Sequence, residues 1–187
     1  MRNKMVRFFT FMLIILALSL ISCNKSIVVK EEGYDLSYII RDPKSWVQGD
    51  LEKLESNIDN FFPDSQIEKK RYLVNEDSKD ELCYWIISLS DSQKSIKIED
   101  IFGNLRDAKS RNINKRNWTV IDIEVRNFDR YEQDPLDILP KAVYKTGISR
   151  TLITKTEKYV YMIMYELNDK SKIFVLEQFT NFIKIDV

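Results

Sequence analysis

Apolar residues repeat at helical spacing in two parts of the chain. The first repeat runs over residues 45–61, where Ser45 and Gln48 have the spacing of a capping box and Pro63 follows the last apolar position. The second runs over Glu99–Ser110, with its apolar residues on one face and acids in its first turn. These two segments predict two amphipathic helices.

Short runs of alternating or continuous apolar residues predict strands in the rest of the chain. The expected strands are Tyr72–Val74, Leu82–Ser90, Ile96–Ile98, Trp118–Val125, Ile148–Thr154, Lys158–Leu167, Lys172–Phe179 and a last one at Ile183–Val187. Polar turns are expected at Asp91–Lys94 and Asn168–Ser171. Lys158–Leu167 is apolar on both of its faces, which is typical of a central strand.

The expected elements do not alternate regularly between strand and helix. Helix, hairpins, helix and further hairpins follow one another, which favours an α+β fold over a parallel α/β fold. We therefore expect a mainly antiparallel sheet with two amphipathic helices. About 140 residues are enough to bury a core without disulfides, so a single globular domain is expected over residues 45–187.

The first 22 residues have a different pattern. Residues 1–7 carry three basic residues and no acidic one, and Phe8–Leu18 is apolar apart from Thr10. A basic start and an apolar core of about 7–15 residues are the parts of a secretory signal. A retained transmembrane helix needs about 20 apolar residues, whereas Phe8–Ser22 offers fifteen, two of them serine. A cleaved export signal is the better interpretation.

Leu20-Ile21-Ser22-Cys23 resembles a lipobox, the cleavage motif of bacterial lipoprotein precursors. In that family the cysteine Sγ receives a diacylglyceryl group, the bond before the cysteine is cut, and the new amino group is often acylated. The resemblance implies cleavage between Ser22 and Cys23 and a lipidated Cys23 at the start of the mature protein. The alternative is an ordinary signal peptide with a cysteine near its cleavage point.

A lipobox divides the chain into a signal peptide (1–22), a lipid-anchored leader (23–44) and the globular domain (45–187). Leu36, Ile39 and Ile40 indicate that the second half of the leader packs onto the domain. Two acyl chains give stable attachment, since each buried CH₂ contributes ~0.8 kcal/mol. The resemblance thus implies a location in the bacterial cell envelope, on the periplasmic face or the cell surface, with membrane lipid as a partner through the acylated Cys23.

The charge balance gives no reason to expect nucleic acid as a partner. The chain has 29 basic and 29 acidic residues, and removal of residues 1–22 takes away three basic residues and no acidic one. The mature protein is therefore slightly acidic. Binding to nucleic acid needs a concentrated basic face, which this composition does not indicate.

The chain contains no histidine. This excludes Ser-His-Asp and Cys-His catalysis and removes the usual zinc ligand sets. The four glycines are too scattered for a phosphate-binding loop, so the sequence indicates no cofactor, no metal site and no catalytic residue. Cys83 lies in the apolar run Leu82–Ile87, which predicts a buried thiol rather than a reactive one.

Carboxylates are the remaining candidates for chemistry. Asp122 and Glu124 are two apart on one expected strand and so share a face, and Glu166 and Glu177 lie on two other expected strands. A facing pair of carboxylates is what glycoside hydrolysis requires. The alternative is that these acids lie on a solvated face among lysines and arginines.

Tyr159, Tyr161 and Tyr165 form a stripe at every second residue of the expected central strand. Such a stripe is a candidate binding surface, on which sugars or a partner protein would stack. The alternative, favoured by a strand that is apolar on both faces, is that these rings belong to the core and only their hydroxyls reach polar partners.

Three functions are compatible with the sequence. The first is a membrane-anchored binding or interaction module that holds an envelope protein, an envelope polymer or a small ligand and performs no catalysis. The second is a carboxylate-dependent hydrolase that acts on envelope glycans. The third is a protective lipoprotein that inhibits a toxin or lytic enzyme from a rival cell.

Overall fold

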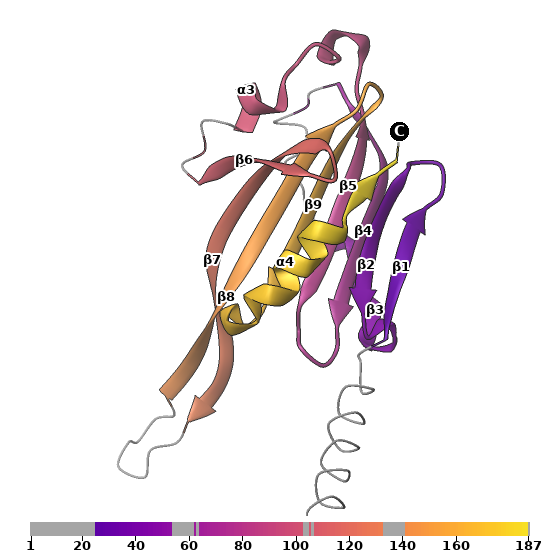
Figure 1. The fold of residues 1–187 in the computed structure, drawn as a ribbon. Coiled ribbons are helices and arrows are strands. Elements are labelled where there is room, and N and C mark those ends of the chain that lie inside the picture. Colours follow the sequence, from indigo (N-terminus) through magenta and orange to yellow (C-terminus); the bar gives the residue numbers. More distant parts are fainter. Residues whose placement is uncertain are drawn as a thin grey trace, which may run out of the picture.

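The computed structural model describes residues 25–53, 62, 64–102, 105, 107–132 and 141–186 (Figure 1). The predicted signal peptide and the lipobox, with Ser22 and Cys23, lie outside the described residues. So do residues 54–61 of the first predicted helix. No helix in the described part of the chain is long and apolar enough to cross a membrane.

Two antiparallel sheets make up the fold. The larger has seven strands in the order β3-β4-β5-β9-β8-β7-β6, and the smaller has three in the order β1-β2-β10. The large sheet consists of β3 (Trp46–Gln48), β4 (Gln66–Asn75), β5 (Glu81–Ser88), β6 (Ala108–Ile113), β7 (Arg116–Glu132), β8 (Lys141–Lys155) and β9 (Tyr159–Leu167). The small sheet consists of β1 (Ser26–Glu31), β2 (Leu36–Arg41) and β10 (Lys184–Ile185). The expected antiparallel architecture is confirmed, and β9 is central, as predicted.

The helices of the described residues are short. They are α3 (Ile98–Phe102) and α4 (Ile173–Phe182), and single 3₁₀ turns lie at Pro43–Ser45, Leu51–Lys53, Asp91–Gln93 and Lys170–Lys172. Helix α4 crosses one face of the large sheet (Figure 1). The described residues therefore form one domain in which helices cover a sheet, but not with the two helices that the sequence predicts.

The core lies on both faces of the large sheet. On one face, Leu36 and Tyr38 of β2 and Leu176 and Phe179 of α4 are buried against the central strands. On the other face, α3 covers a second cluster that contains Cys83, which is fully buried. Burial raises the pKa of the Cys83 thiol, so the thiolate is disfavoured and the predicted buried, unreactive cysteine is confirmed.

The first predicted helix is wrong where the structure describes it. Trp46–Gln48 pairs with β4 as the edge strand β3, and tertiary contacts of Trp46 account for this. Its indole N–H donates to the carbonyl of Arg41 over 2.8 Å, and its ring lies edge-on to Tyr165 with the centroids 5.9 Å apart. These contacts outweigh the helical spacing of the apolar residues.

The second predicted helix and the neighbouring strand are also revised. Helix α3 ends at Phe102, and Ala108–Ile113, which overlaps the end of the predicted helix, is β6. Asn114 and Lys115 both have positive φ angles, 49° and 66°, as a two-residue turn of type I′ requires. This turn pairs β6 with β7. The strand predicted at Ile96–Ile98 does not form, because Ile98 begins α3.

The segment predicted as a strand at Lys172–Phe179 is helix α4. Its β-branched and aromatic residues suggest a strand, but Leu176, Phe179, Thr180 and Ile183 are buried at helical spacing. Asp169 accepts a hydrogen bond from the backbone N–H of Ser171 just before the helix, which turns the chain back over the sheet.

The range predicted as a leader contains two strands. Residues 26–41 form the β1–β2 hairpin, and Leu36 and Ile40 are buried, so this segment belongs to the folded domain. The expectation that the second half of the predicted leader packs onto the domain agrees with this burial. β2 lies between β1 and β10, and it supplies one wall of the core because α4 packs against it.

The two ends of the molecule differ. At one end, here called the turn end, lie the β1–β2 turn, the β8–β9 turn and β10 (Figure 1). At the opposite end, the arm end, β1 begins, β9 finishes, and β7 and β8 continue past β9 as a two-stranded hairpin. A six-residue strand such as β1 spans about 20 Å, so the two ends are at least that far apart.

Candidate functional site

The four candidate carboxylates do not form one site. Asp122, Glu124 and Glu177 lie on the face of the large sheet that α4 covers, since Asp122 and Arg150 pair with each other and Glu177 is on α4. Glu166 alternates along β9 with the buried Tyr165 and Leu167 of that face, so it points to the opposite face.

Asp122 and Glu177 lie close together because both bind the same buried arginine, Arg150. The Arg150 side chain is 5% exposed. Its Nε and Nη2 each donate to Asp122 over 2.7 Å, and its Nη1 donates to Glu177 over 2.7 Å and to Thr180 over 3.1 Å. Glu124 is likewise paired, with Lys170. These acids neutralise basic side chains rather than facing an open site.

The ion pairs also fix the protonation of Glu177. A hydrogen bond from Arg111 lowers the pKa of Glu177, burial works against this, and hydrogen bonding to Arg150 adds to the lowering. A glycosidase needs one carboxylic acid with a raised pKa beside a carboxylate. Glu177 is held ionised, so it does not supply the acid that the hydrolase hypothesis requires of this pair.

The pKa of Glu166 is shifted in the opposite direction, upward. Burial raises the pKa of Glu166, the charge of Glu81 on the neighbouring strand raises it further, and a hydrogen bond with Asn127 lowers it. Glu81 and Glu166 are direct cross-strand partners. This face lies across the sheet from Asp122 and Glu177, so Glu166 is not available to them as a second carboxylate.

The tyrosine stripe is not an exposed platform. Tyr161 and Tyr165 are 1% and 6% exposed, whereas Tyr159 is half-buried. The Tyr161 hydroxyl donates to the carbonyl of Tyr34 over 2.7 Å, and the Tyr165 ring lies 4.8 Å from that of Phe179. Because β9 is central and covered on both faces, the binding surface predicted at these three tyrosines is wrong for Tyr161 and Tyr165, which belong to the core.

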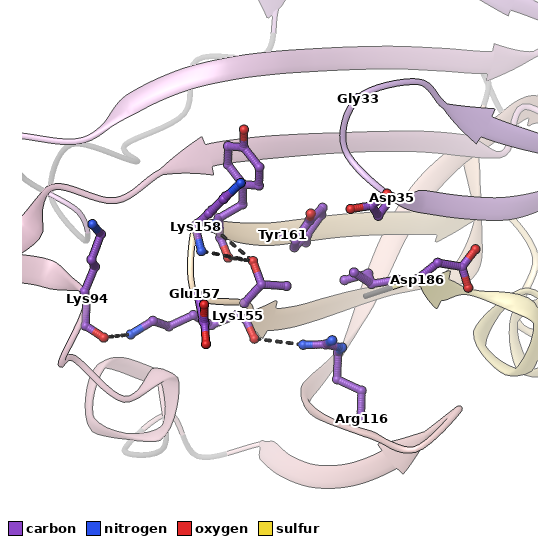
Figure 2. Close-up of a pocket in the computed structure, with 12 residues that line it drawn as sticks. Gly33, Asp35, Lys94, Arg116, Lys155, Glu157, Lys158, Tyr161 and Asp186 are labelled. Carbon is purple, nitrogen blue, oxygen red and sulfur yellow. Dashed lines mark hydrogen bonds between the residues drawn. The ribbon is translucent and has the colours of Figure 1, made fainter.

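A cavity of about 660 Å³ opens at the turn end, beside the start of β9 (Figure 2). The β1–β2 and β8–β9 turns, the segment at Lys94, the residue after β10 and the strands β7, β8, β9 and β10 contribute its walls. The lining residues are Gly33, Asp35, Lys94, Arg116, Lys155, Thr156, Glu157, Lys158, Tyr159, Tyr161, Ile185 and Asp186. Binding pockets for small molecules have volumes of about 300–1,000 Å³, so this turn-end cavity has the size of a ligand site.

One wall of the turn-end cavity is acidic. Asp35 ends the β1–β2 turn with a positive φ angle of 55°, and its carbonyl accepts a hydrogen bond from the backbone N–H of Asp186 over 2.9 Å. This bond holds the chain after β10 against the turn. Two carboxylates from distant parts of the sequence therefore lie along the same side of the cavity (Figure 2).

The opposite side carries Lys94, Arg116, Lys155 and Lys158, together with Glu157 of the β8–β9 turn (Figure 2). The Arg116 Nη1 donates to the carbonyl of Lys155 over 3.1 Å. The Lys155 ammonium is occupied, since it donates to the carbonyl of Ile96 over 2.8 Å and to that of Lys94. Among the described residues Arg116 forms no ion pair, so its remaining N–H groups are available to a ligand.

Sequence reasoning identified only part of this site. Tyr159 and Tyr161 were candidates, and both line the turn-end cavity, but as a floor rather than an open platform. Asp35, Arg116 and Asp186 were not candidates, because each is an ordinary charged residue in a turn or at the end of a strand. The pairing of β1–β2 with β10, and of β7 with β8, brings them together.

Comparisons with known proteins support the fold. No protein-family model matches the sequence, and no curated protein matches it. A crystal structure from Bacteroides thetaiotaomicron VPI-5482 is similar, with a TM-score of 0.51 and 10% identity over 88% of this chain and 49% of that chain. The present chain thus spans about half the length of that protein. At this identity the likeness concerns the fold alone.

Two further structures have lower TM-scores. Cyanobacterial PsbP (CyanoP) from Synechocystis sp. PCC 6803 has a TM-score of 0.46 at 6% identity, over 88% of this chain and 94% of that chain. The Ran-binding protein Mog1p of Saccharomyces cerevisiae has a TM-score of 0.41 at 7% identity, over 87% of this chain and 96% of that chain. Neither likeness identifies a function for this chain.

Proposed function

We propose that the chain is a lipid-anchored binding protein of the bacterial cell envelope that performs no catalysis. The lipobox at Leu20–Cys23 supports the anchor. The observation that carries the binding role is the turn-end cavity, where Arg116 forms no ion pair with any described residue although Asp35 and Asp186 line the opposite wall. A cavity whose charges are separated in this way is suited to a ligand that bears both charges.

The ligand class follows from the two walls. Arg116 presents a planar set of donors that suits a carboxylate or phosphate group, and Asp35 and Asp186 suit an ammonium group. The half-buried Tyr159 offers ring surface between the two walls. A short peptide with free termini combines these features. We therefore assign the cavity to zwitterionic ligands of peptide type.

The position of the cavity agrees with an anchor at Cys23. Cys23 lies three residues before Ser26, where β1 begins at the arm end. The cavity lies at the opposite, turn end, about 20 Å or more away along β1. A protein held by Cys23 at its arm end is thus able to present the cavity away from the membrane, toward the envelope space.

Binding through Arg116 is tested with trialanine as the probe. We expect the detergent-solubilised, lipidated protein to bind trialanine in isothermal titration calorimetry, and Arg116→Met to weaken binding about tenfold or more. A hydrogen bond to a charged group contributes about 1.5–3 kcal/mol, and ~1.4 kcal/mol is a factor of ten. N-acetylated and C-amidated trialanine are expected to bind more weakly, because each lacks one charge.

Arg126→Met is the matched control for this titration, since Arg126 lies on the β7–β8 hairpin, far from the cavity. It is expected to leave the affinity unchanged. No heat of binding with trialanine, or equal affinity for the blocked and free peptides, would contradict the assignment of the cavity to zwitterions.

The anchor is tested by replacing Cys23. In the native host, Cys23→Ser is expected to abolish incorporation of labelled palmitate and to leave the protein unprocessed or released from the membrane fraction. In the lipoprotein family that the motif resembles, the diacylglyceryl group is attached to the lipobox cysteine, which corresponds to Cys23 here. Cys83→Ser is the matched control and is expected to keep both labelling and membrane association, because Cys83 is buried. Unchanged labelling of Cys23→Ser would refute the anchor.

A further inference from the structure

β7 and β8 continue well beyond the rest of the large sheet. The last residue of β9, Leu167, pairs with Ile148 of β8, and β6 pairs with β7 only as far as Ile121. Beyond these points β7 and β8 pair only with each other, from Val125 and Gly147 outward. We call residues 125–132 and 141–147 the β7–β8 arm. Seven residues of strand extend about 24 Å, and Figure 1 shows the arm projecting from the sheet.

A series of hydrogen bonds places the arm and the start of β1 at the same end. The backbone N–H of Asp42 donates to the carbonyl of Lys25, which joins the start of β1 to the end of β2. The N–H of Glu76 donates to the carbonyl of Ser45, which joins that end of β2 to the β4–β5 turn. The N–H of Asn168 donates to Asp80, which joins this turn to the end of β9.

The distance from the lipid to this end is short. Cys23 lies three residues before Ser26, and three residues span at most about 10 Å. The arm projects about twice as far from the same end of the molecule. A protein anchored through Cys23 on so short a tether therefore brings the arm to the bilayer surface.

The arm has the chemistry of a membrane interface. Its described basic side chains are Arg126, Arg130, Lys141 and Lys145, of which Arg130 and Lys145 pair with Asp129, each over 2.6 Å. Tyr144 is 45% exposed, and the Arg126 guanidinium lies 4.2 Å from the centroid of its ring. Aromatic rings beside lysine and arginine are typical of the zone of lipid headgroups.

The start of α4 adds apolar side chains at this end. Ile173 and Phe174, in its first turn, are 39% and 56% exposed. Lys172 directly precedes them in the sequence, and Lys170, which pairs with Glu124, lies two residues earlier. In Figure 1 this end of α4 lies toward the arm end of the molecule. An exposed phenylalanine beside lysines is suited to shallow insertion between headgroups, with the ammonium groups in the polar layer.

We propose that the β7–β8 arm and Phe174 form a membrane-docking surface for anionic lipid headgroups, which orients the anchored domain with its turn-end cavity away from the bilayer. This proposal rests on the lipid anchor at Cys23. Basic residues held near an anionic surface are attracted to it, so the arm would fix the orientation of a domain that its acyl chains already hold to the membrane.

The experiment uses lipidated full-length protein reconstituted into vesicles of phosphatidylcholine and phosphatidylglycerol that contain a nitroxide-labelled lipid. A fluorophore is attached at Ala142→Cys on the arm, at Phe174→Cys on α4, or at Glu157→Cys at the turn end as the matched control. Cys83 is fully buried and is not expected to react. We expect strong quenching at positions 142 and 174 and little at position 157.

Each outcome has a separate meaning. If the protein floats with the vesicles and position 142 is quenched no more than position 157, the docking surface is refuted while the anchor stands. If the protein does not float with the vesicles, the anchor itself fails. In the supporting case, Arg126→Gln with Lys145→Gln should lower quenching at position 142, and vesicles of phosphatidylcholine alone should lower it equally. Lys94→Gln with Lys158→Gln at the turn end should leave it unchanged.

Discussion

Arg150→Met is expected to lower the free energy of unfolding by about 3 kcal/mol. Removing one partner of a buried ion pair costs about 3–5 kcal/mol, because the remaining charge loses its compensation. The lower end applies here, since the Asp122 and Glu177 side chains are 35% and 37% exposed and water can reach them. Methionine fills most of the space of the aliphatic part of Arg150, so the loss measures the polar contacts rather than a cavity.

The free energy of unfolding is measured by urea denaturation, which is monitored by circular dichroism. The loss in Arg150→Met is compared with the loss in Arg111→Met. Arg111 contacts the same carboxylate, Glu177, over 2.8 Å, but its side chain is 40% exposed. An exposed pair contributes about 0.2–1 kcal/mol, so the control should lose less than 1 kcal/mol. Equal losses in the two variants would show that Arg150 does not hold α4 to β7 and β8.

The same cluster predicts a dependence on pH. The pKa of Glu177 in the folded protein lies below its ordinary value of 4.5. A depressed pKa contributes stability that is present above pH 4.5 and is lost as the pH falls through the folded value. The difference between the native protein and Arg150→Met should therefore be largest at neutral pH and should narrow below pH 4.5.

The strands could be predicted from the sequence where burial follows the period of the strand. β9 was expected as a central strand because it is apolar on both faces, and its position as the fourth of seven strands agrees. In the segments whose secondary structure was predicted wrongly, contacts with residues far away in the sequence outweigh the local pattern of apolar residues. Trp46 reads as part of a helix, but its contacts with Arg41 and Tyr165 hold it in an edge strand.

The candidate site could be predicted only in part. Tyr159 and Tyr161 could be identified because their alternating spacing is visible within one short segment. The residues around Arg116 in the sequence do not distinguish it from other lysines and arginines. Its role depends on which acids lie near it, and β-sheet pairing between segments far apart in the chain decides this. The same holds for Asp122 and Glu177, whose partner, Arg150, could not be identified before the helix α4 was placed over β8.

Phe179→Ala tests the helix that the sequence misassigned, and it is expected to lower the free energy of unfolding by about 3–5 kcal/mol. Phe179 is 2% exposed, and its ring lies 4.8 Å from that of Tyr165 and 6.3 Å from that of Tyr38. It therefore joins α4 to both sheets, and alanine would leave a cavity where the three meet.

Phe174→Ala in the same helix is the control, because its side chain is 56% exposed and an exposed substitution changes stability by about 0.5 kcal/mol or less. A strand at this position would instead alternate, so that Val175 and Phe179 shared one face and Leu176 lay on the other. Chemical denaturation should show a loss of about 2–5 kcal/mol for Leu176→Ala, which is fully buried in the helix. A small loss for Leu176→Ala beside a large one for Phe179→Ala would contradict the helix, and with it the placement of Phe174 and Arg150.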